Sequence, residues 1–221
     1  MSFQIAIDGP SATGKSTLAK ALAKELSFIY IDTGAMYRAV GLYNIRKNID
    51  LNNEADVVNT LKDISIDIKY IDKEQRIFLN GEDVSSQIRE EKVGTAASIV
   101  STYKKVREVL VDLQRSLANV QNVIMDGRDI GTVVLPNASL KIFLTASSEE
   151  RTKRRYLELK EKGKDVSIED VAKELEERDE RDTKRANSPL TKAEDAILVD
   201  TTNMNIEQTI EHIKNLYEKR K

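Results

Sequence analysis

The chain of 221 residues has no cysteine, no tryptophan and a single histidine, His212. Without cysteine it forms no disulfide, and it offers neither a thiolate ligand for a metal nor a thiol nucleophile. His212 stands beside the apolar Ile213 in a predicted C-terminal helix, which is typical of a structural or solvated side chain. These absences exclude thiol and disulfide chemistry and argue against histidine triads and histidine-rich metal sites.

Long apolar runs are also absent, since no stretch approaches the roughly 20 apolar residues that span a bilayer. Residues 1–8 lack the charged leader and the cleavage site of a signal peptide. The 35 basic and 37 acidic side chains leave a net charge of −2, which excludes the strongly basic surface of a nucleic-acid-binding domain. We therefore expect a cytoplasmic protein with no membrane or nucleic-acid partner. The sequence contains no coiled-coil seam or large apolar helix that would favour assembly, so we expect a monomer.

The N-terminal residues have the pattern of a parallel α/β sheet. An apolar strand at residues 3–8 runs into a glycine-rich loop, and Leu18, Leu22 and Leu26 then form the apolar stripe of a helix. A second apolar strand follows at residues 28–31. Strand, loop, helix and strand in this order predict the opening of such a sheet, flanked by helices.

The period then changes to two, because apolar and polar residues alternate from Ile64 to Tyr70. A second run over residues 76–79 ends at Asn80-Gly81, a strong hairpin signal. One polar face suits a peripheral antiparallel sheet, so residues 64–90 are predicted as a small insert.

The remaining sequence alternates between predicted helices and core strands. Gly163 is expected to divide the charge-rich segment 149–185 into two helices. We predict a single domain with its core at about 1–63, 91–148 and 186–221, and a helical lid at about 149–185. Helices are expected at 35–48, 54–63, 93–120 (in two pieces) and from Ile206 to the end, and further strands at 123–126, 140–144 and 196–199.

Residues 9–16, GPSATGKS, fit the phosphate-loop pattern G-x-x-x-x-G-K-[ST]. The glycines let successive backbone amides converge on phosphate oxygens, and the following helix adds its positive end. Lys15 is placed to reach the β- and γ-phosphates, and the Ser16 hydroxyl to bind Mg²⁺. The predicted ATP-binding residues are Gly9, Pro10, Ser11, Ala12, Thr13, Gly14, Lys15, Ser16 and Thr17.

Two further groups of charges follow the motif. Asp126 ends the predicted strand 123–126, as a Walker-B-like acid would, and is a candidate to hold Mg²⁺ through water; the alternative is a cap for the next turn. Arg178, Arg181, Asp182 and Arg185 share one helix face. For a charge-rich helix in general, pairing within the helix with Glu177, Asp179 and Glu180 is the favoured explanation, so a phosphate-binding role is only a hypothesis at this point.

A phosphate loop permits a GTPase, an ATP-driven motor or a small-molecule kinase. The N-K-x-D segment that reads guanine in GTPases is absent, and motors need a larger frame. The size of the chain favours a small kinase.

In combination, these motifs resemble those of bacterial cytidylate kinases, from residue 8 to about 190 and in the same order. The segment 77–84, IFLNGEDV, also resembles the characteristic insert of that family. The runs that carry the resemblance are 8–16 (DGPSATGKS), 32–38 (DTGAMYR), 126–134 (DGRDIGTVV) and 177–182 (ERDERD).

The resemblance implies a P-loop nucleoside monophosphate kinase that transfers phosphate from ATP, with Mg²⁺, to CMP or dCMP. Lys15, Arg128, Arg181 and Arg185 would act in catalysis. Thr33 stands where the family often has serine, and its hydroxyl is retained. The implied CMP-binding residues are Thr33, Arg38, Ser98, Arg107, Arg128, Asp129, Arg178, Asp182 and Arg185.

The implied roles agree with the chemistry. A carboxylate such as Asp129 accepts from the exocyclic amine of cytosine, and Arg107 donates to its acceptors; uracil would present a carbonyl to the same carboxylate. The accepting phosphate is already ionised at neutral pH, so no general base is required. The alternatives are a kinase for another small acceptor, such as uridylate or a non-nucleotide metabolite, and a non-catalytic nucleotide-binding regulator.

Overall fold

The computed structural model describes residues 2–71, 74–119 and 121–221. The chain folds into two compact units, a first unit of residues 1–30 and 120–221 and a second unit of residues 31–119. Each contains a hydrophobic cluster of its own. The second unit extends beyond the predicted insert at 64–90 on both sides, because helical residues pack with the small sheet. The predicted boundaries of insert and lid stay predictions.

A parallel sheet forms the centre of the first unit. Its strand order is β2-β6-β1-β7-β8, with β2 (Ile29–Asp32) beginning in this unit. The other strands are β1 (Gln4–Asp8), β6 (Val123–Gly127), β7 (Leu140–Thr145) and β8 (Ile197–Asp200). β1 pairs in parallel with both β6 and β7, with Asp8 opposite Gly127. The loops that follow β1 and β6 therefore start at the same edge of the sheet.

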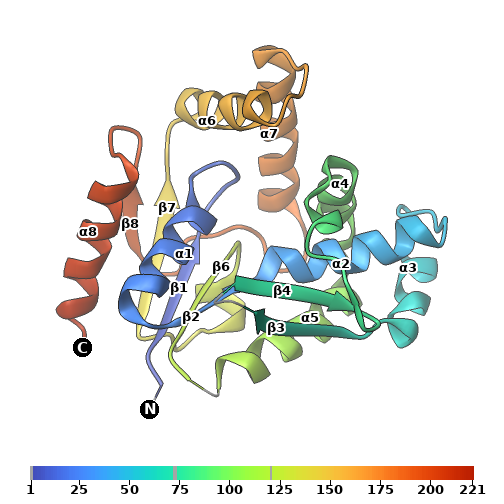
Figure 1. The fold of residues 1–221 in the computed structure, drawn as a ribbon, viewed down its shortest axis with the longest axis horizontal. Helices are drawn as coiled ribbons and strands as arrows, with labels where there is room; N and C mark the ends of the chain where they lie inside the picture. The colour runs from blue at the N-terminus through green and yellow to red at the C-terminus, as the bar shows by residue number, and fades with distance from the viewer. Residues whose placement is uncertain (1, 72–73, 120) are drawn as a thin grey trace. The chain divides into compact units, whose positions relative to one another are not determined.

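Helices α1 (Lys15–Leu26) and α8 (Ile206–Glu218) pack together against this sheet (Figure 1). Leu18 and Leu22 of α1 and Ile213 of α8 are fully buried in the same cluster as β1. A capping box at Asn205 begins α8, because the Asn205 side chain and Gln208 satisfy each other's backbone N–H groups.

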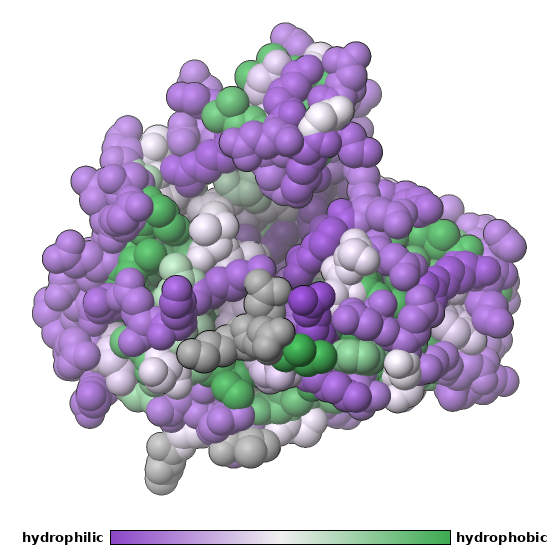
Figure 2. All heavy atoms as spheres, in the orientation of Figure 1, coloured by the Kyte–Doolittle hydropathy of each residue, from purple (hydrophilic) through white to green (hydrophobic). Residues whose placement is uncertain are grey.

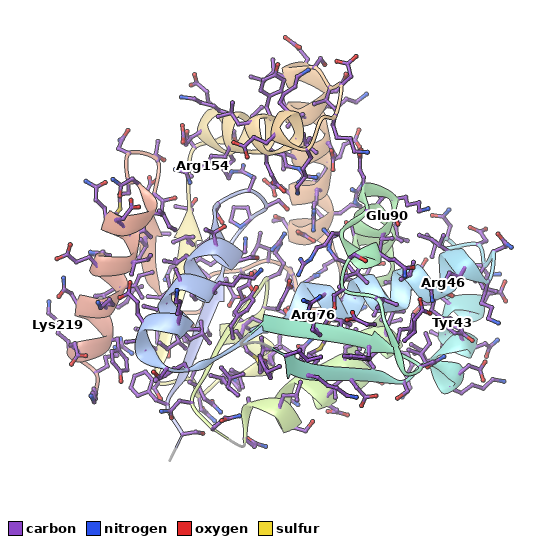
Figure 3. All side chains as sticks on the ribbon, viewed as in Figure 1. Tyr43, Arg46, Arg76, Glu90, Arg154 and Lys219 are labelled. Carbon is purple, nitrogen blue, oxygen red and sulfur yellow. The ribbon has the colours of Figure 1, made fainter. Side chains whose placement is uncertain are left out.

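Helices α6 (Ser148–Glu161) and α7 (Ile168–Lys184) form the charge-rich part of the first unit. Gly163, with φ of 71°, lies between them, as the sequence predicts. Hydrophilic side chains cover most of both helices in Figure 2, and a small apolar cluster around Leu159, Val171 and Leu175 packs between them. Arg154 of α6, labelled in Figure 3, donates to the hydroxyl and the carbonyl of Thr201 after β8.

The second unit combines a three-stranded antiparallel sheet with helices. Asn80 and Gly81 join two of the strands with φ of 50° and 84°, a turn with positive φ at both central residues. Arg46, the last residue of the helix that spans Thr33–Arg46 (Figure 3), pairs with Glu82 at 2.7 Å. The strands are β3 (Ile66–Ile71), β4 (Glu74–Leu79) and β5 (Glu82–Asp83). The helices are α2 (Thr33–Arg46), α3 (Glu54–Thr60), η1 (Leu61–Asp63), η2 (Gln87–Arg89), α4 (Glu91–Val100) and α5 (Lys104–Ala118).

The predicted fold class is confirmed: a parallel sheet flanked by helices, a small antiparallel sheet and a helical segment at 148–184. The predicted helix at 93–120 is two helices, interrupted at residues 101–103. Two short elements were not predicted. The 3-10 helix η2 lies at the end of the segment predicted as a small antiparallel sheet, and a π-helical turn, η3 (Ile130–Val134), begins at the third residue after β6.

Candidate functional site

The phosphate loop joins β1 to α1, and its glycines have backbone conformations that other residues rarely adopt. Gly9 has φ of 148°, and a Cβ atom there would lie 2.0 Å from the carbonyl oxygen of Leu144. Gly14 has φ of 86° and occupies the N-cap position of α1, whose first turn contains no acidic residue. The loop therefore ends on a helix N-terminus suited to an anion.

Lys15, the motif lysine, is buried and directed back into its own loop. Its Nζ donates to the carbonyl of Pro10 and to Oγ1 of Thr13, the latter at 3.2 Å. Burial, together with the neighbouring guanidinium of Arg128, lowers the pKa of Lys15 well below its ordinary value. A phosphate in the loop would supply the negative charge that favours the ammonium form.

Ser16 and Asp126, the two candidate magnesium ligands, are in contact. The Ser16 hydroxyl donates to Oδ2 of Asp126 at 2.7 Å, and the Tyr30 hydroxyl donates to Oδ1 at 2.8 Å. A hydroxyl and a carboxylate are oxygen ligands of the kind that Mg²⁺ prefers. No three His, Cys, Asp or Glu side chains cluster as metal ligands within the part of the chain described.

Arg128 links the phosphate loop to α7. Its Nη2 donates to the Ser11 hydroxyl at 2.8 Å, and its Nε pairs with Oδ2 of Asp182 at 2.7 Å. Burial opposes both charges, but their attraction prevails: the pKa of Arg128 is raised and that of Asp182 is lowered. Both groups are therefore charged at neutral pH.

Asp129 and Arg185 form a second buried pair of predicted site residues. Nη2 of Arg185 lies 3.5 Å from Oδ1 of Asp129, and Nε of Arg185 donates to the carbonyl of Ser188 at 2.6 Å. Both side chains are less than a tenth exposed. Arg178 and Arg181 lie half-buried on α7, and the charge of Arg178 helps to lower the pKa of Asp182.

Two residues that sequence reasoning missed hold the backbone of Ser11. The Asp179 carboxylate accepts from the Ser11 N–H at 3.4 Å and pairs with Arg151. Nη1 of Arg151 donates to the Ser11 carbonyl at 3.2 Å. Asp179 stands inside the run ERDERD that the sequence singled out, whereas nothing distinguishes Arg151 among the many charges of its helix.

The second unit holds the other four implied CMP-binding residues. Thr33 is the first residue of α2, and the carboxylate of Asp32 caps this helix. Arg38 donates from Nη1 to the carbonyl of Ile88 at 3.0 Å. Ser98 is buried in α4, and Arg107 is only 4 % exposed, with its guanidinium 5.4 Å from the ring centre of Tyr37.

Within the first unit, the structure therefore gathers most of the predicted site: the phosphate loop, Ser16 with Asp126, Arg128 with Asp182, and Asp129 with Arg185. Tyr30, from the apolar strand predicted at residues 28–31, joins this group through its hydroxyl, which donates to Asp126. The catalytic and binding roles of all these residues remain predictions.

Comparison with known proteins places this geometry in a family. A family model described as cytidylate kinase matches residues 5–219. The chain belongs to the cytidylate kinase family. The cytidylate kinase of Caldicellulosiruptor bescii is 52 % identical to it over 98 % of this chain and 96 % of the relative. The cytidylate kinase of Desulfitobacterium hafniense is 49 % identical over 97 % and 92 %.

Membership of the cytidylate kinase family identifies the chain as a kinase. Among solved structures, an uncharacterized protein from Eubacterium ventriosum shares the fold, with a TM-score of 0.56 and 12 % identity over 99 % of each chain. Across the residues that the structure describes, no helix is both long enough and apolar enough to cross a membrane.

Proposed function

We propose that the protein transfers the γ-phosphoryl group of ATP to CMP and dCMP, giving CDP and dCDP, in the pyrimidine nucleotide metabolism of the cytoplasm. The observation that carries the proposal is the set of charged groups beside the phosphate loop. Arg128 contacts Ser11 of the loop, and the next residue, Asp129, is a buried carboxylate suited to an amine donor such as that of cytosine.

On the donor side, the backbone amides of residues 9–14 and the N-terminus of α1 bind the triphosphate. Lys15 turns from the Pro10 carbonyl to the β- and γ-phosphates, which restore the charge that burial disfavours. Ser16 and the neighbouring Asp126 would hold Mg²⁺, directly or through water, and the ion would supply positive charge against the phosphate oxygens.

On the acceptor side, Arg38, Arg128 and Arg185 bind the phosphate of CMP. A planar guanidinium meets two phosphate oxygens at once, which orients the acceptor as well as attracting it. Asp182 and Arg178 hold the sugar hydroxyls, so Arg128 exchanges its Asp182 partner for phosphate when CMP binds. Arg181 of α7 adds positive charge near the transferring group.

Base recognition falls to Asp129, Arg107 and Ser98. The Asp129 carboxylate accepts from the cytosine amine, and Arg107 donates to the ring acceptors. Uracil places a carbonyl opposite Asp129 and leaves a buried carboxylate without that donor, which is costly. The site thus discriminates by hydrogen bonding as well as by size.

The transfer step needs no general base, because the accepting phosphate has lost its second proton at neutral pH. An oxygen of the CMP phosphate attacks the γ-phosphorus. The bond between the γ-phosphorus and the oxygen that bridges the β- and γ-phosphates breaks, and ADP leaves. Positioning and charge neutralisation supply the catalysis. The single histidine of the chain has no part in the reaction.

An ADP-release assay across acceptors tests this proposal. CMP and dCMP should support Mg²⁺-dependent release of ADP with formation of CDP and dCDP, and UMP much less. Preference for UMP or for a non-nucleotide acceptor would support the kinase alternative. ATP binding without acceptor-dependent turnover would support the regulator.

A further inference from the structure

The turn that follows Asp129 begins with two backbone N–H groups that need acceptors. η3 starts at Ile130, and Asp129 occupies its N-cap position. Aspartate is among the residue types that most often cap such a turn with their own side chain. Here Asp129 makes no side-chain capping bond to the described residues of the turn.

Asp8, at the end of β1, caps η3 instead of Asp129. Its Oδ1 accepts from the Ile130 N–H at 2.8 Å, and its Oδ2 accepts from the Gly131 N–H at 2.7 Å. The two carboxylate oxygens of Asp8, on β1, therefore accept from two successive amides of η3. The side chain of Asp8 is only 4 % exposed, so water does not compete for these bonds.

The packing around Gly131 permits this close approach. A Cβ atom at residue 131 would lie 3.4 Å from Oδ2 of Asp8 and 3.1 Å from Cδ of Lys141. Glycine thus leaves room for the carboxylate beside the turn. The ammonium group of Lys141 itself is directed to Pro136 and Asp195.

Because Asp129 does not cap η3, its carboxylate is directed to Arg185, with Oδ1 at 3.5 Å from Nη2. Were Asp129 to cap its own turn, this carboxylate would rotate toward the backbone amides. We infer that Asp8 is a positioning residue: by capping η3 from β1, it holds the Asp129 carboxylate in the orientation that selects the acceptor base. The selective role rests on the proposed function, whereas the capping does not.

The ionisation of Asp8 agrees with this role. Burial raises its pKa to about 6, while the two backbone donors lower it and nearby Asp129 raises it further. Lys15 opposes the shift with its positive charge. At neutral pH the group is therefore mostly ionised, with both oxygens able to accept.

The first test is Asp8→Asn, which keeps the shape of the side chain but replaces one acceptor oxygen by an NH₂ group. One amide of the turn then loses its acceptor, and we expect the ratio of kcat/KM for CMP over UMP to fall about tenfold. The Kd for ATP should change by less than about twofold, since Lys15 and the loop are kept. An unchanged CMP:UMP ratio in a folded variant overturns the inference.

Two controls separate positioning from lost stability. Asn205→Ala removes a capping side chain from α8, and we expect lower stability with an unchanged CMP:UMP ratio. In an Asp129→Ala background, Asp8→Asn should change that ratio by less than about twofold, because the two residues act through one group. Equal effects of Asp8→Asn with and without Asp129 contradict the inference.

A measurement on the unaltered protein covers the case in which Asp8→Asn does not fold. Scalar coupling through the hydrogen bonds, from the amide nitrogens of Ile130 and Gly131 to the Asp8 carboxyl carbon, should be detectable by NMR. Its absence from both amides overturns the capping. If the wild type shows no CMP turnover, the proposed function fails, and this coupling still decides whether Asp8 caps the turn.

Discussion

At the scale of single residues, Lys15 illustrates how a buried charge is prepared for a ligand. Its ammonium group has exchanged water for one carbonyl and one hydroxyl, and both burial and Arg128 lower its pKa. A lysine in these surroundings is stabilised as a cation when an anion arrives. The motif alone indicates the residue type, and the burial of Lys15 supports the phosphate partner that we propose.

Lys15→Ala should lower kcat by about 10²–10³, the scale seen when one donor to the reacting charge is removed. CMP affinity should change little, because the proposed CMP contacts lie elsewhere. The coupled assay gives kcat, and calorimetry gives the CMP affinity of the same preparation. Simultaneous loss of CMP binding and of the folded far-UV spectrum would indicate a structural role for Lys15 instead.

Asp129→Ala should lower the preference for CMP over UMP by about 10²-fold or more, since a site built to hydrogen-bond one base rejects the other mainly through this group. The measurement is kcat/KM for each nucleotide at fixed ATP. Equal losses for CMP and UMP would show that Asp129 does not read the base.

Asp8 also makes a prediction about stability and pH. Its pKa is about 6 in the folded protein against 3.8 for the ordinary side chain. The folded state therefore holds a proton that the unfolded state has lost between these values, so stability falls as pH rises through this window. Relative to Asp8→Asn, the free energy of unfolding of the wild type should decrease by about 2 kcal/mol from pH 4 to pH 6.5. Urea unfolding of both proteins across this range measures it, and a flat difference would contradict the shift.

At the scale of elements, α6 and α7 contribute residues that contact the phosphate loop. Arg151 of α6 and Asp179 of α7 hold the backbone of Ser11, and Asp182 of α7 holds Arg128. In the proposed reaction, a triphosphate would compete with Asp179 for the Ser11 amide, and an acceptor phosphate would compete with Asp182 for Arg128. Ligand binding would therefore exchange contacts of α7.

CMP together with a non-hydrolysable ATP analogue should slow amide hydrogen exchange in residues 149–185, because the arginines there gain phosphate contacts. Mass spectrometry of peptides from α6 and α7 measures this, with peptides from α8 as the internal control. Unchanged exchange in α6 and α7 at saturating ligand would exclude a lid that closes.

The elements themselves follow largely from local sequence. The positive φ values at Gly163 and at Asn80-Gly81 occur where the sequence predicts a helix break and a hairpin turn. By contrast, η3 carries no local signal, because its capping group belongs to β1, more than a hundred residues earlier.

At the scale of the whole molecule, each compact unit contains residues for which the family resemblance implies a role in CMP binding. The first unit holds Arg128, Asp129 and Arg185, and the second holds Arg38, Ser98 and Arg107. A ligand that binds only the folded state stabilises all the elements on which its site depends.

CMP at about 100 times its Kd should raise the free energy of unfolding by about 2.7 kcal/mol. For a chain of this length, this corresponds to a rise in Tm of roughly 5–10 °C. Thermal unfolding with CMP and with UMP at the same concentration measures the effect, and UMP should give the smaller shift. An equal shift for both nucleotides would contradict base-selective binding.

By itself the sequence determined the parallel sheet, the hairpin, the helices and the phosphate loop, because periodicity, turn residues and a contiguous motif are properties of neighbouring residues. It also singled out Arg128, Asp129 and Asp182 by their resemblance to a family. Only the tertiary structure decided which distant residues contact the site. Asp8 caps η3, Tyr30 donates to Asp126, and Arg151 and Asp179 hold the backbone of Ser11. These contacts join residues far apart in the chain, and whether a carboxylate caps a turn or is directed to a guanidinium depends on the burial and distances that packing imposes.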